Sequence, residues 1–179
     1  MSWKTLKSTL VFDNPWISVR EDHVVNPGGG ENQYGHVQFK NQAIAIVPLD
    51  EAGYTWIVGQ DRYTLGEYSW EVPMGGSPLA DDRVASAHRE LREETGLSAG
   101  RMTELMKVHT SNSITDEVGY IYLAEELTAG EQDLEQTENI TARRLPLEDA
   151  IDMVYDGSIT DAMSCVALMR VRDLLRQRD

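Results

Sequence analysis

Three glutamates lie close together near the middle of the chain, at positions 90, 93 and 94. On an α-helix, residues three and four apart share one face, so Glu90, Glu93 and Glu94 would gather in a single patch. Like charges at that spacing destabilise a helix unless the patch faces water or a cation lies over it. Carboxylate oxygens suit hard divalent ions, magnesium and manganese above all. The patch therefore predicts either a solvated acidic surface or a metal site.

The composition is that of an ordinary globular protein with a large excess of acidic residues. Of 179 residues, 41% are hydrophobic, and the formal net charge is −14. This charge argues against a protein that wraps nucleic acid or coats an anionic membrane. Cys165 is the only cysteine, which excludes an intrachain disulfide and a cysteine-based zinc cage. We expect a cytoplasmic protein, because the sequence shows neither a signal peptide nor an apolar run of membrane-spanning length.

The order of the expected elements predicts an α/β layered fold, with a mixed sheet between helices. Residues 1–40 alternate in polarity between turn signals and predict a small antiparallel strand unit, whose thin core must pack on something else. Residues 41–179 predict the main domain, in which a helix at 82–95 follows a strand at 68–73. Gly75 and Gly76 lie between that strand and that helix, so we expect a tight turn there.

The stretch from Gly75 to Leu97 resembles the signature of the Nudix hydrolases, G-x5-E-x7-R-E-U-x-E-E-x-G-U, in which U is aliphatic. The match covers 23 residues and departs at one defined position, where Asp81 replaces glutamate. The N-terminal strand unit and the segments 58–63 and 70–76 are also similar to the branch that acts on ADP-ribose and nucleoside diphosphate sugars. The resemblance implies a Nudix α/β/α sandwich with a mixed sheet, to which the N-terminal unit is added.

The resemblance also implies a division of roles around the signature. Glu90 and Glu94 would bind the metal, together with Glu93 and the backbone carbonyl of Met74. Arg89 and Glu93 form an i,i+4 pair, so Arg89 would orient a carboxylate in catalysis without touching the substrate. Bound Mg²⁺, or Mn²⁺, would neutralise the glutamates, grip a diphosphate and lower the pKa of the water that attacks phosphorus. Glu93 and Glu94 are therefore expected to be catalytic as well as metal-binding.

The general base or last metal ligand is expected in one of two acidic loops outside the signature. The candidates are Asp116 and Glu117 in the loop 109–117, and Glu135 and Glu138 in the loop 131–139. The resemblance favours Glu138 as a catalytic and metal-binding residue. An acidic loop of this kind is also typical of solvated surface, and this alternative stays open.

Substrate contacts are expected from positions on both sides of the glutamates in the sequence. Arg62 suits bidentate contact with phosphate, and the alternative is an ion pair at the surface. Trp16 would stack on the substrate base, and the alternative is an ordinary core position. Glu71 would accept hydrogen bonds from the base or the ribose, and Gly75 and Gly76 would line the substrate site.

These expectations combine into an Mg²⁺-dependent hydrolase of nucleoside diphosphate sugars or ADP-ribose, which releases a nucleoside monophosphate and a sugar phosphate. The loop 111–116 lacks the proline that is common in the ADP-ribose branch, which favours sugar nucleotides. The alternatives are hydrolysis of dinucleoside polyphosphates or of reduced nicotinamide dinucleotide, and a non-catalytic nucleotide sensor of the same fold. Residues 1–40 are expected to join two chains as a homodimer and to contact the base, with residues 41–179 as the catalytic domain.

Overall fold

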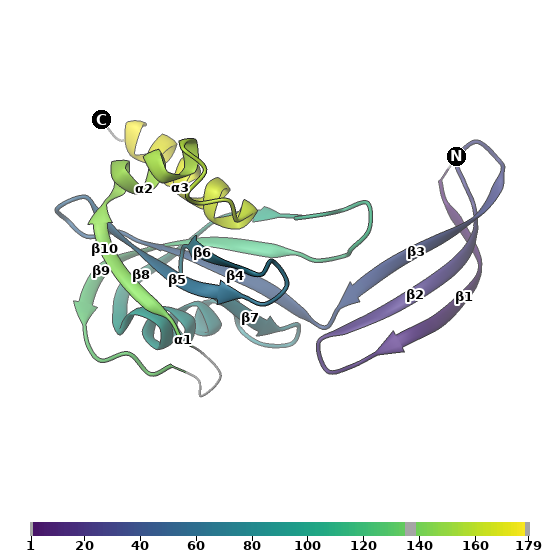
Figure 1. Ribbon diagram of the computed structural model, residues 1–179, viewed down its shortest axis with the longest axis horizontal. Coiled ribbons are helices and arrows are strands. Elements are labelled where there is room, and N and C mark those ends of the chain that lie inside the picture. The colour runs from purple at the N-terminus through teal and green to yellow at the C-terminus, as the bar shows by residue number, and fades with distance from the viewer. Residues whose placement is uncertain (1, 135–138, 178–179) are drawn as a thin grey trace.

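The computed structural model describes residues 2–134 and 139–177. Two sheets lie between helices, and a three-stranded antiparallel sheet extends away from them (Figure 1). One of the two inner sheets is mixed, because its central pair of strands is parallel and the outer pairs are antiparallel. The predicted layered fold with an antiparallel N-terminal unit is therefore confirmed. No helix in the described ranges is long and apolar enough to cross a membrane.

The N-terminal unit is a meander of three strands: β1 (Lys4–Asp13), β2 (Ile17–Val25) and β3 (Glu31–Phe39). All of β1 is exposed, including apolar side chains toward its end, namely Leu10, Val11 and Phe12. Three strands without a covering layer cannot bury such side chains. The unit therefore leaves apolar surface in solvent, and the expectation that it packs on something else stays a prediction.

The main body contains two sheets. The four-stranded sheet has the order β7–β4–β9–β8, from Met74–Pro78, Asn41–Pro48, Gly119–Ala129 and Leu97–Val108. The three-stranded sheet has the order β10–β5–β6, from Thr141–Pro146, Tyr54–Arg62 and Glu67–Glu71. The chain thus places β6 and β7 in different sheets although only two residues separate them.

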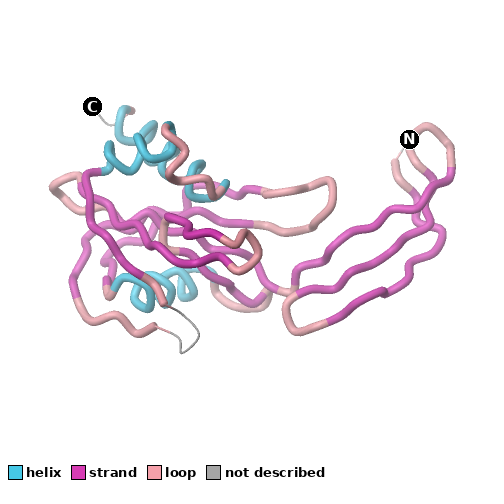
Figure 2. The backbone as a smooth tube through the Cα atoms, viewed as in Figure 1, coloured by secondary structure: helices cyan, strands magenta, loops and turns pink. Residues whose placement is uncertain are grey.

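Helices cover both sides of these sheets (Figures 1 and 2). Helix α1 (Arg83–Thr95) lies on one side, and α2 (Leu147–Tyr155) and α3 (Ala162–Arg176) lie on the other. The arrangement buries both faces of the central strand β4, which fits the continuous apolar run of the sequence at residues 43–49. Two hydrophobic clusters result, one against α1 and one against α2 and α3.

Strand β4 supplies alternate side chains to the two clusters. Ile44 and Ile46 pack in the cluster with Leu91 of α1. Val47, which points to the opposite face, packs in the cluster with Leu168 of α3. All five of these side chains are fully buried. The position of α1 against the sheet is therefore fixed by tight apolar packing, which is what holds its glutamates in place.

Local capping sets the ends of α1. The Asp82 side chain accepts a hydrogen bond from the Val84 N–H at 2.9 Å, so the helix begins one residue later than predicted. Gly96 ends the helix with a left-handed φ of 73° and donates its N–H to the carbonyl of Arg92. The predicted stop at Gly96 is confirmed.

The predicted turn at Gly75 and Gly76 is wrong. The strand expected at 68–73 ends at Glu71, and the two glycines belong to β7, where Gly75 lies opposite Ile44 of β4. Neither glycine has a positive φ, and the turn into α1 comes later, at residues 79–82. The presence of glycine at position 75 must therefore have a cause other than a turn.

Candidate active site

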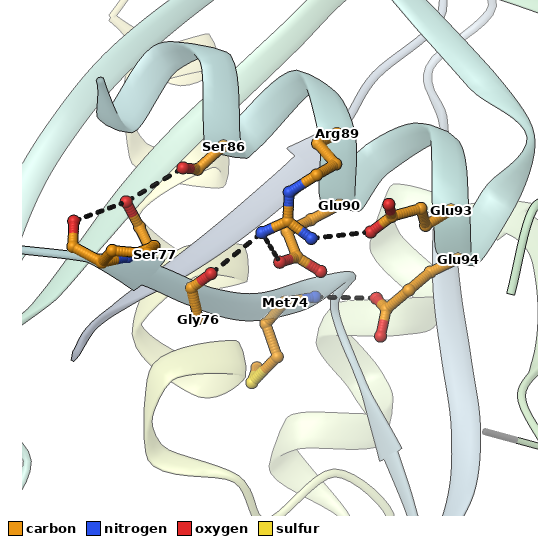
Figure 3. A network of polar contacts seen from close by, with 9 residues as sticks. Met74, Gly76, Ser77, Ser86, Arg89, Glu90, Glu93 and Glu94 are labelled. Atoms are coloured by element: carbon orange, nitrogen blue, oxygen red, sulfur yellow. Dashed lines mark hydrogen bonds and ion pairs between the residues drawn. The ribbon is translucent and has the colours of Figure 1, made fainter. Parts of the chain in front are cut away.

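The glutamates of α1 face strand β7 and form one patch (Figure 3). Glu90 and Glu94 are 8% and 2% exposed, and Glu93 is half-buried. The Met74 N–H of β7 donates a hydrogen bond to Oε2 of Glu94 at 2.8 Å. Carboxylates are costly to bury without partners. The solvated-surface interpretation of the patch is therefore wrong, and the interpretation as a site remains.

Arg89 connects the patch to the strand beside it (Figure 3). Its Nη1 donates to Oε2 of Glu93 at 2.8 Å, and its Nη2 donates to Oε1 of Glu90 at 2.6 Å and to the Gly76 carbonyl at 3.0 Å. Partial burial opposes the charge of the guanidinium, but Glu90 and Glu93 outweigh this effect and raise the pKa of Arg89. A permanently charged Arg89 thus orients two carboxylates, which is the geometry expected for its predicted role.

Gly75 is a glycine because Glu90 lies directly against it. A Cβ atom at position 75 would be 2.1 Å from Cδ and Oε2 of Glu90, far inside van der Waals contact. At Gly76 the nearest atom to such a Cβ is Nδ2 of Asn41, at 3.4 Å. Close approach of backbone to a functional group is a common reason for glycine within a strand. Gly75 therefore gives space to a metal-ligand candidate and does not form a turn.

Arg62 and Glu71 were expected to contact substrate separately, but they form an ion pair. Nε of Arg62 donates to Oε1 of Glu71 at 2.8 Å, and Nη2 donates to Oε2. Glu71 is 3% exposed, whereas the Arg62 side chain is 36% exposed. The hydrogen bond that Arg62 donates to Glu71 raises the pKa of Arg62 despite partial burial, and the charge of Glu94 adds to the effect. Nη1 makes no hydrogen bond within the described residues, so it is available to a phosphate.

A cleft lies between the main body and the N-terminal unit, and we call it the Trp16 cleft. Its walls include Arg62 and the start of β7 on the body, Trp16 and Phe39 on the N-terminal unit, and Glu117. Trp16 is 65% exposed, so the alternative of an ordinary core position is wrong. Its backbone is fixed, because Oδ1 of Asn14 accepts the Trp16 N–H at 2.9 Å. An exposed aromatic ring on a fixed backbone is suited to stacking on a base.

The loop 109–117 is attached to β3, which brings Glu117 to the cleft. The Val37 N–H donates to the Ile114 carbonyl at 2.9 Å, and Oδ1 of Asp116 accepts the Phe39 N–H at 2.7 Å. Oε2 of Glu117 accepts a hydrogen bond from the Thr110 hydroxyl. Asp116 therefore serves to hold the loop, whereas Glu117 lines the Trp16 cleft.

The other loop with candidate bases carries Glu135 and Glu138. Both residues lie outside the described ranges, so Glu138 as base and metal ligand stays a prediction. Sequence reasoning also missed four residues of the Trp16 cleft, namely Phe39, Asn41, Gln42 and Ala43. No motif marks them. The only hint in the sequence is their position. They lie where the chain passes from the N-terminal unit into β4, and the cleft lies between that unit and the main body.

Comparison with known proteins agrees with this geometry. Residues 40–162 match the model of the NUDIX domain. The chain belongs to the Nudix family of hydrolases. Residues 3–37 match a second model, the nucleoside diphosphate sugar hydrolase N-terminal domain. The two matches together span the N-terminal unit and most of the main body of this Nudix hydrolase.

Individual relatives cover nearly the whole chain. An ADP-ribose pyrophosphatase of Bacillus subtilis (strain 168) is 29% identical over 167 residues, which are 92% of this chain and 90% of that protein. An ADP-ribose pyrophosphatase of Mycobacterium tuberculosis (strain ATCC 25618 / H37Rv) is 31% identical over 172 residues, which are 94% and 83%. The crystal structure of an ADP compounds hydrolase has a TM-score of 0.89 at 21% identity and covers 99% of this chain and 96% of its own. The last comparison supports the Nudix fold.

Nudix hydrolases generally use divalent metal ions, and the donor chemistry here fits such an ion. Glu90 and Glu94 offer buried hard oxygens on one helix face, and Gly75 leaves the space beside Glu90 free of a side chain. In residues 2–134 and 139–177, no three acidic, histidine or cysteine side chains form a ready-made metal cluster. Additional ligands must come from backbone oxygens or from elsewhere. Met74 contacts the patch through its N–H, and its carbonyl as a ligand stays a prediction.

Proposed function

We propose that this Nudix hydrolase splits the pyrophosphate bond of a nucleoside diphosphate sugar or of ADP-ribose and releases a nucleoside monophosphate and a sugar phosphate. The observation that carries the proposal is the Trp16 cleft, in which an exposed Trp16 and a partly exposed Arg62 lie beside the strand that contacts Glu90. An aromatic face, a guanidinium and a metal-binding carboxylate patch are what a base and a diphosphate require. The names of the two pyrophosphatases and of the N-terminal domain model support this substrate class.

Mg²⁺ is the proposed cofactor, with Mn²⁺ as a substitute, and Glu90, Glu93 and Glu94 are its proposed ligands. When bound, such an ion supplies charge neutralisation to a diphosphate and lowers the pKa of a coordinated water. Arg89 keeps Glu90 and Glu93 in fixed orientations through hydrogen bonds of 2.6 and 2.8 Å. Preorganised charges of this kind need little rearrangement during the reaction, which favours catalysis.

The other proposed site residues bind the substrate and accept the proton of the attacking water. Arg62 directs Nη1 toward the diphosphate, while its other donors stay on Glu71. Trp16 stacks on the base and accepts any base, because stacking uses only the flat face. Glu138 takes the proton of the attacking water, with Glu117 as the alternative base that already lines the cleft.

We further propose that residues 1–40 join two chains as a homodimer and that residues 41–179 are the catalytic domain. Strand β1 leaves Leu10, Val11 and Phe12 more than half exposed on a sheet that no other layer of the described residues covers. Apolar surface of this kind marks an interaction site, and a second copy of the same unit would cover it symmetrically. The single cysteine supports a cytoplasmic, reducing location.

The proposal is tested by incubating the protein with Mg²⁺ and ADP-ribose, GDP-mannose, UDP-glucose or a diadenosine polyphosphate, and by measuring release of nucleoside monophosphate. We expect release from ADP-ribose or a sugar nucleotide, its loss in EDTA, and a fall of more than about 100-fold in Glu94→Gln. Glu148→Gln, which changes an exposed carboxylate on α2, is the matched control. Release from the diadenosine compound alone would change the substrate class. Binding without release from any compound would indicate a sensor.

A further inference from the structure

A second cleft shares Arg62 with the Trp16 cleft and leads away from it, and we call it the Ser69 cleft. Besides Arg62, Thr64 and Leu65, its lining comes from β6 and from the residues just before α3: Glu67, Ser69, Glu71, Thr160 and Asp161. Successive side chains of a strand point to opposite faces, so the three residues of β6 share one face. Because both clefts contain Arg62, they are neighbours along one surface.

Ser69 is the residue that points to a ligand. It is 7% exposed, yet its hydroxyl makes no hydrogen bond within the described residues. Other buried serines of this chain are paired: Ser77 and Ser86 bond to each other at 2.9 Å, and Ser164 donates to Asp161 at 2.8 Å. The Ser69 hydroxyl oxygen is not fully shut off from solvent, so it opens into the cleft and can bond there to water or to a bound molecule. At the wall of a cleft, the partner can come from a bound molecule.

The side chains that line the Ser69 cleft determine which kind of molecule it can bind. Glu67 and Thr160 make no side-chain hydrogen bond in the part of the chain that the structure describes, and Asp161 uses only Oδ2, on Ser164. The one cation, Arg62, is already paired with Glu71. An additional phosphate would meet a surplus of carboxylates and be repelled. A hydroxyl-rich uncharged group can donate to the carboxylates and exchange hydrogen bonds with the hydroxyls.

We propose that the Ser69 cleft binds the sugar of the substrate, on the side of the diphosphate opposite to the base. This inference rests on the proposed function, and it assigns the two ends of the substrate to two clefts. Arg62, which both clefts share, lies where the diphosphate connects them. The surplus of negative charge around Ser69 makes a sugar nucleotide a better ligand than a dinucleoside polyphosphate, whose extra phosphates would approach Glu67 and Asp161.

The test uses two analogues that the enzyme cannot hydrolyse. Isothermal titration with Mg²⁺ measures binding of the α,β-methylene analogue of ADP-ribose and of α,β-methylene ADP, which has the same adenosine and bridge but lacks the terminal ribose. We expect Ser69→Ala to weaken binding of the analogue with the terminal ribose about three- to tenfold, as for one lost hydrogen bond, and binding of the analogue without it less than about twofold. Thr160→Val should show the same selectivity. Ser98→Ala, at an exposed position of β8, should change neither.

Equal effects on both analogues, no effect in either variant, or a wild-type protein that binds neither analogue would overturn the assignment. Turnover of ADP-ribose itself, measured on the same samples, separates this inference from the proposed function. Hydrolysis with indifference to Ser69 and Thr160 would refute the sugar site alone. Selective binding without hydrolysis would refute the proposed reaction and leave the sugar site in place.

Discussion

Replacing Gly75 by alanine is expected to damage catalysis much more than stability. The added Cβ would lie 2.1 Å from the Glu90 carboxylate, and ordinary contact begins at 3.4 Å, so the carboxylate must move by about 1.3 Å. The atoms in conflict are the end of a flexible side chain, which can rotate away. Alanine in an extended strand also reduces the entropy of the unfolded chain. The free energy of unfolding should therefore change by only about 1 kcal/mol.

Catalysis cannot tolerate the same movement. A displacement of about 1 Å in a positioned group costs on the order of 100-fold in rate, so kcat/KM of Gly75→Ala should fall by about that factor. Glu90 would also lose its present hydrogen bond of 2.6 Å to Arg89. We therefore expect weaker metal activation, seen as a higher Mg²⁺ concentration for half-maximal rate.

The assay combines steady-state kinetics, a Mg²⁺ titration of the rate and thermal unfolding. Gly76→Ala is the graded comparison, because its Cβ would meet only Asn41 at 3.4 Å and should cost less than about tenfold. Gly35→Ala, in β3 with no atom within 4 Å of the added Cβ, controls for glycine replacement in a strand. A Gly75→Ala enzyme as active as Gly76→Ala, or one that is inactive only because it unfolds, would refute the reasoning.

Four more substitutions test separate parts of the site. Trp16→Ala should raise KM about tenfold at nearly unchanged kcat, since stacking contributes about 1–3 kcal/mol, and unchanged KM would argue against stacking. Arg62→Lys should raise KM and lower the unfolding temperature, because lysine cannot form the bidentate pair with Glu71. Glu138→Gln should lower kcat on the order of 100-fold and flatten the acidic limb of the pH–rate profile, whereas near-normal turnover would remove Glu138 from the site. Phe12→Asp should produce monomers in light scattering, and a wild-type monomer would contradict the proposed homodimer.

Local spacing along a helix made the centre of the site predictable. Arg89 and Glu93 are one helical turn apart, and the predicted pair is present at 2.8 Å. The stop of α1 at Gly96 depends on the same short range. Neither feature depends on contacts between distant segments, so both could be predicted from residues that are close in the sequence.

Contacts that depend on strand register were not predictable in the same way. The hairpin of β5 and β6 places Glu67 opposite Arg62, and the Arg62 side chain reaches along the sheet to Glu71, a partner that no rule of helical spacing suggests. Gly75 was assigned to a turn because glycine suits both turns and close approaches, and only the position of Glu90 distinguishes them. The exposure of Trp16 likewise depends on where the N-terminal unit lies.

Backbone hydrogen bonds frame the Trp16 cleft. The Trp16 carbonyl accepts the Lys40 N–H, the Val118 carbonyl accepts the Ala43 N–H, and Val37 bonds to Ile114, each at 2.9 Å. Main-chain groups are the same whatever side chain a residue carries, so substitutions at Trp16 or Glu117 would change the chemistry of the walls without changing the span between them. The backbone thus sets the size of the ligand that the cleft can hold, and the side chains set its chemical preference. New preferences can arise in this architecture by single side-chain replacements.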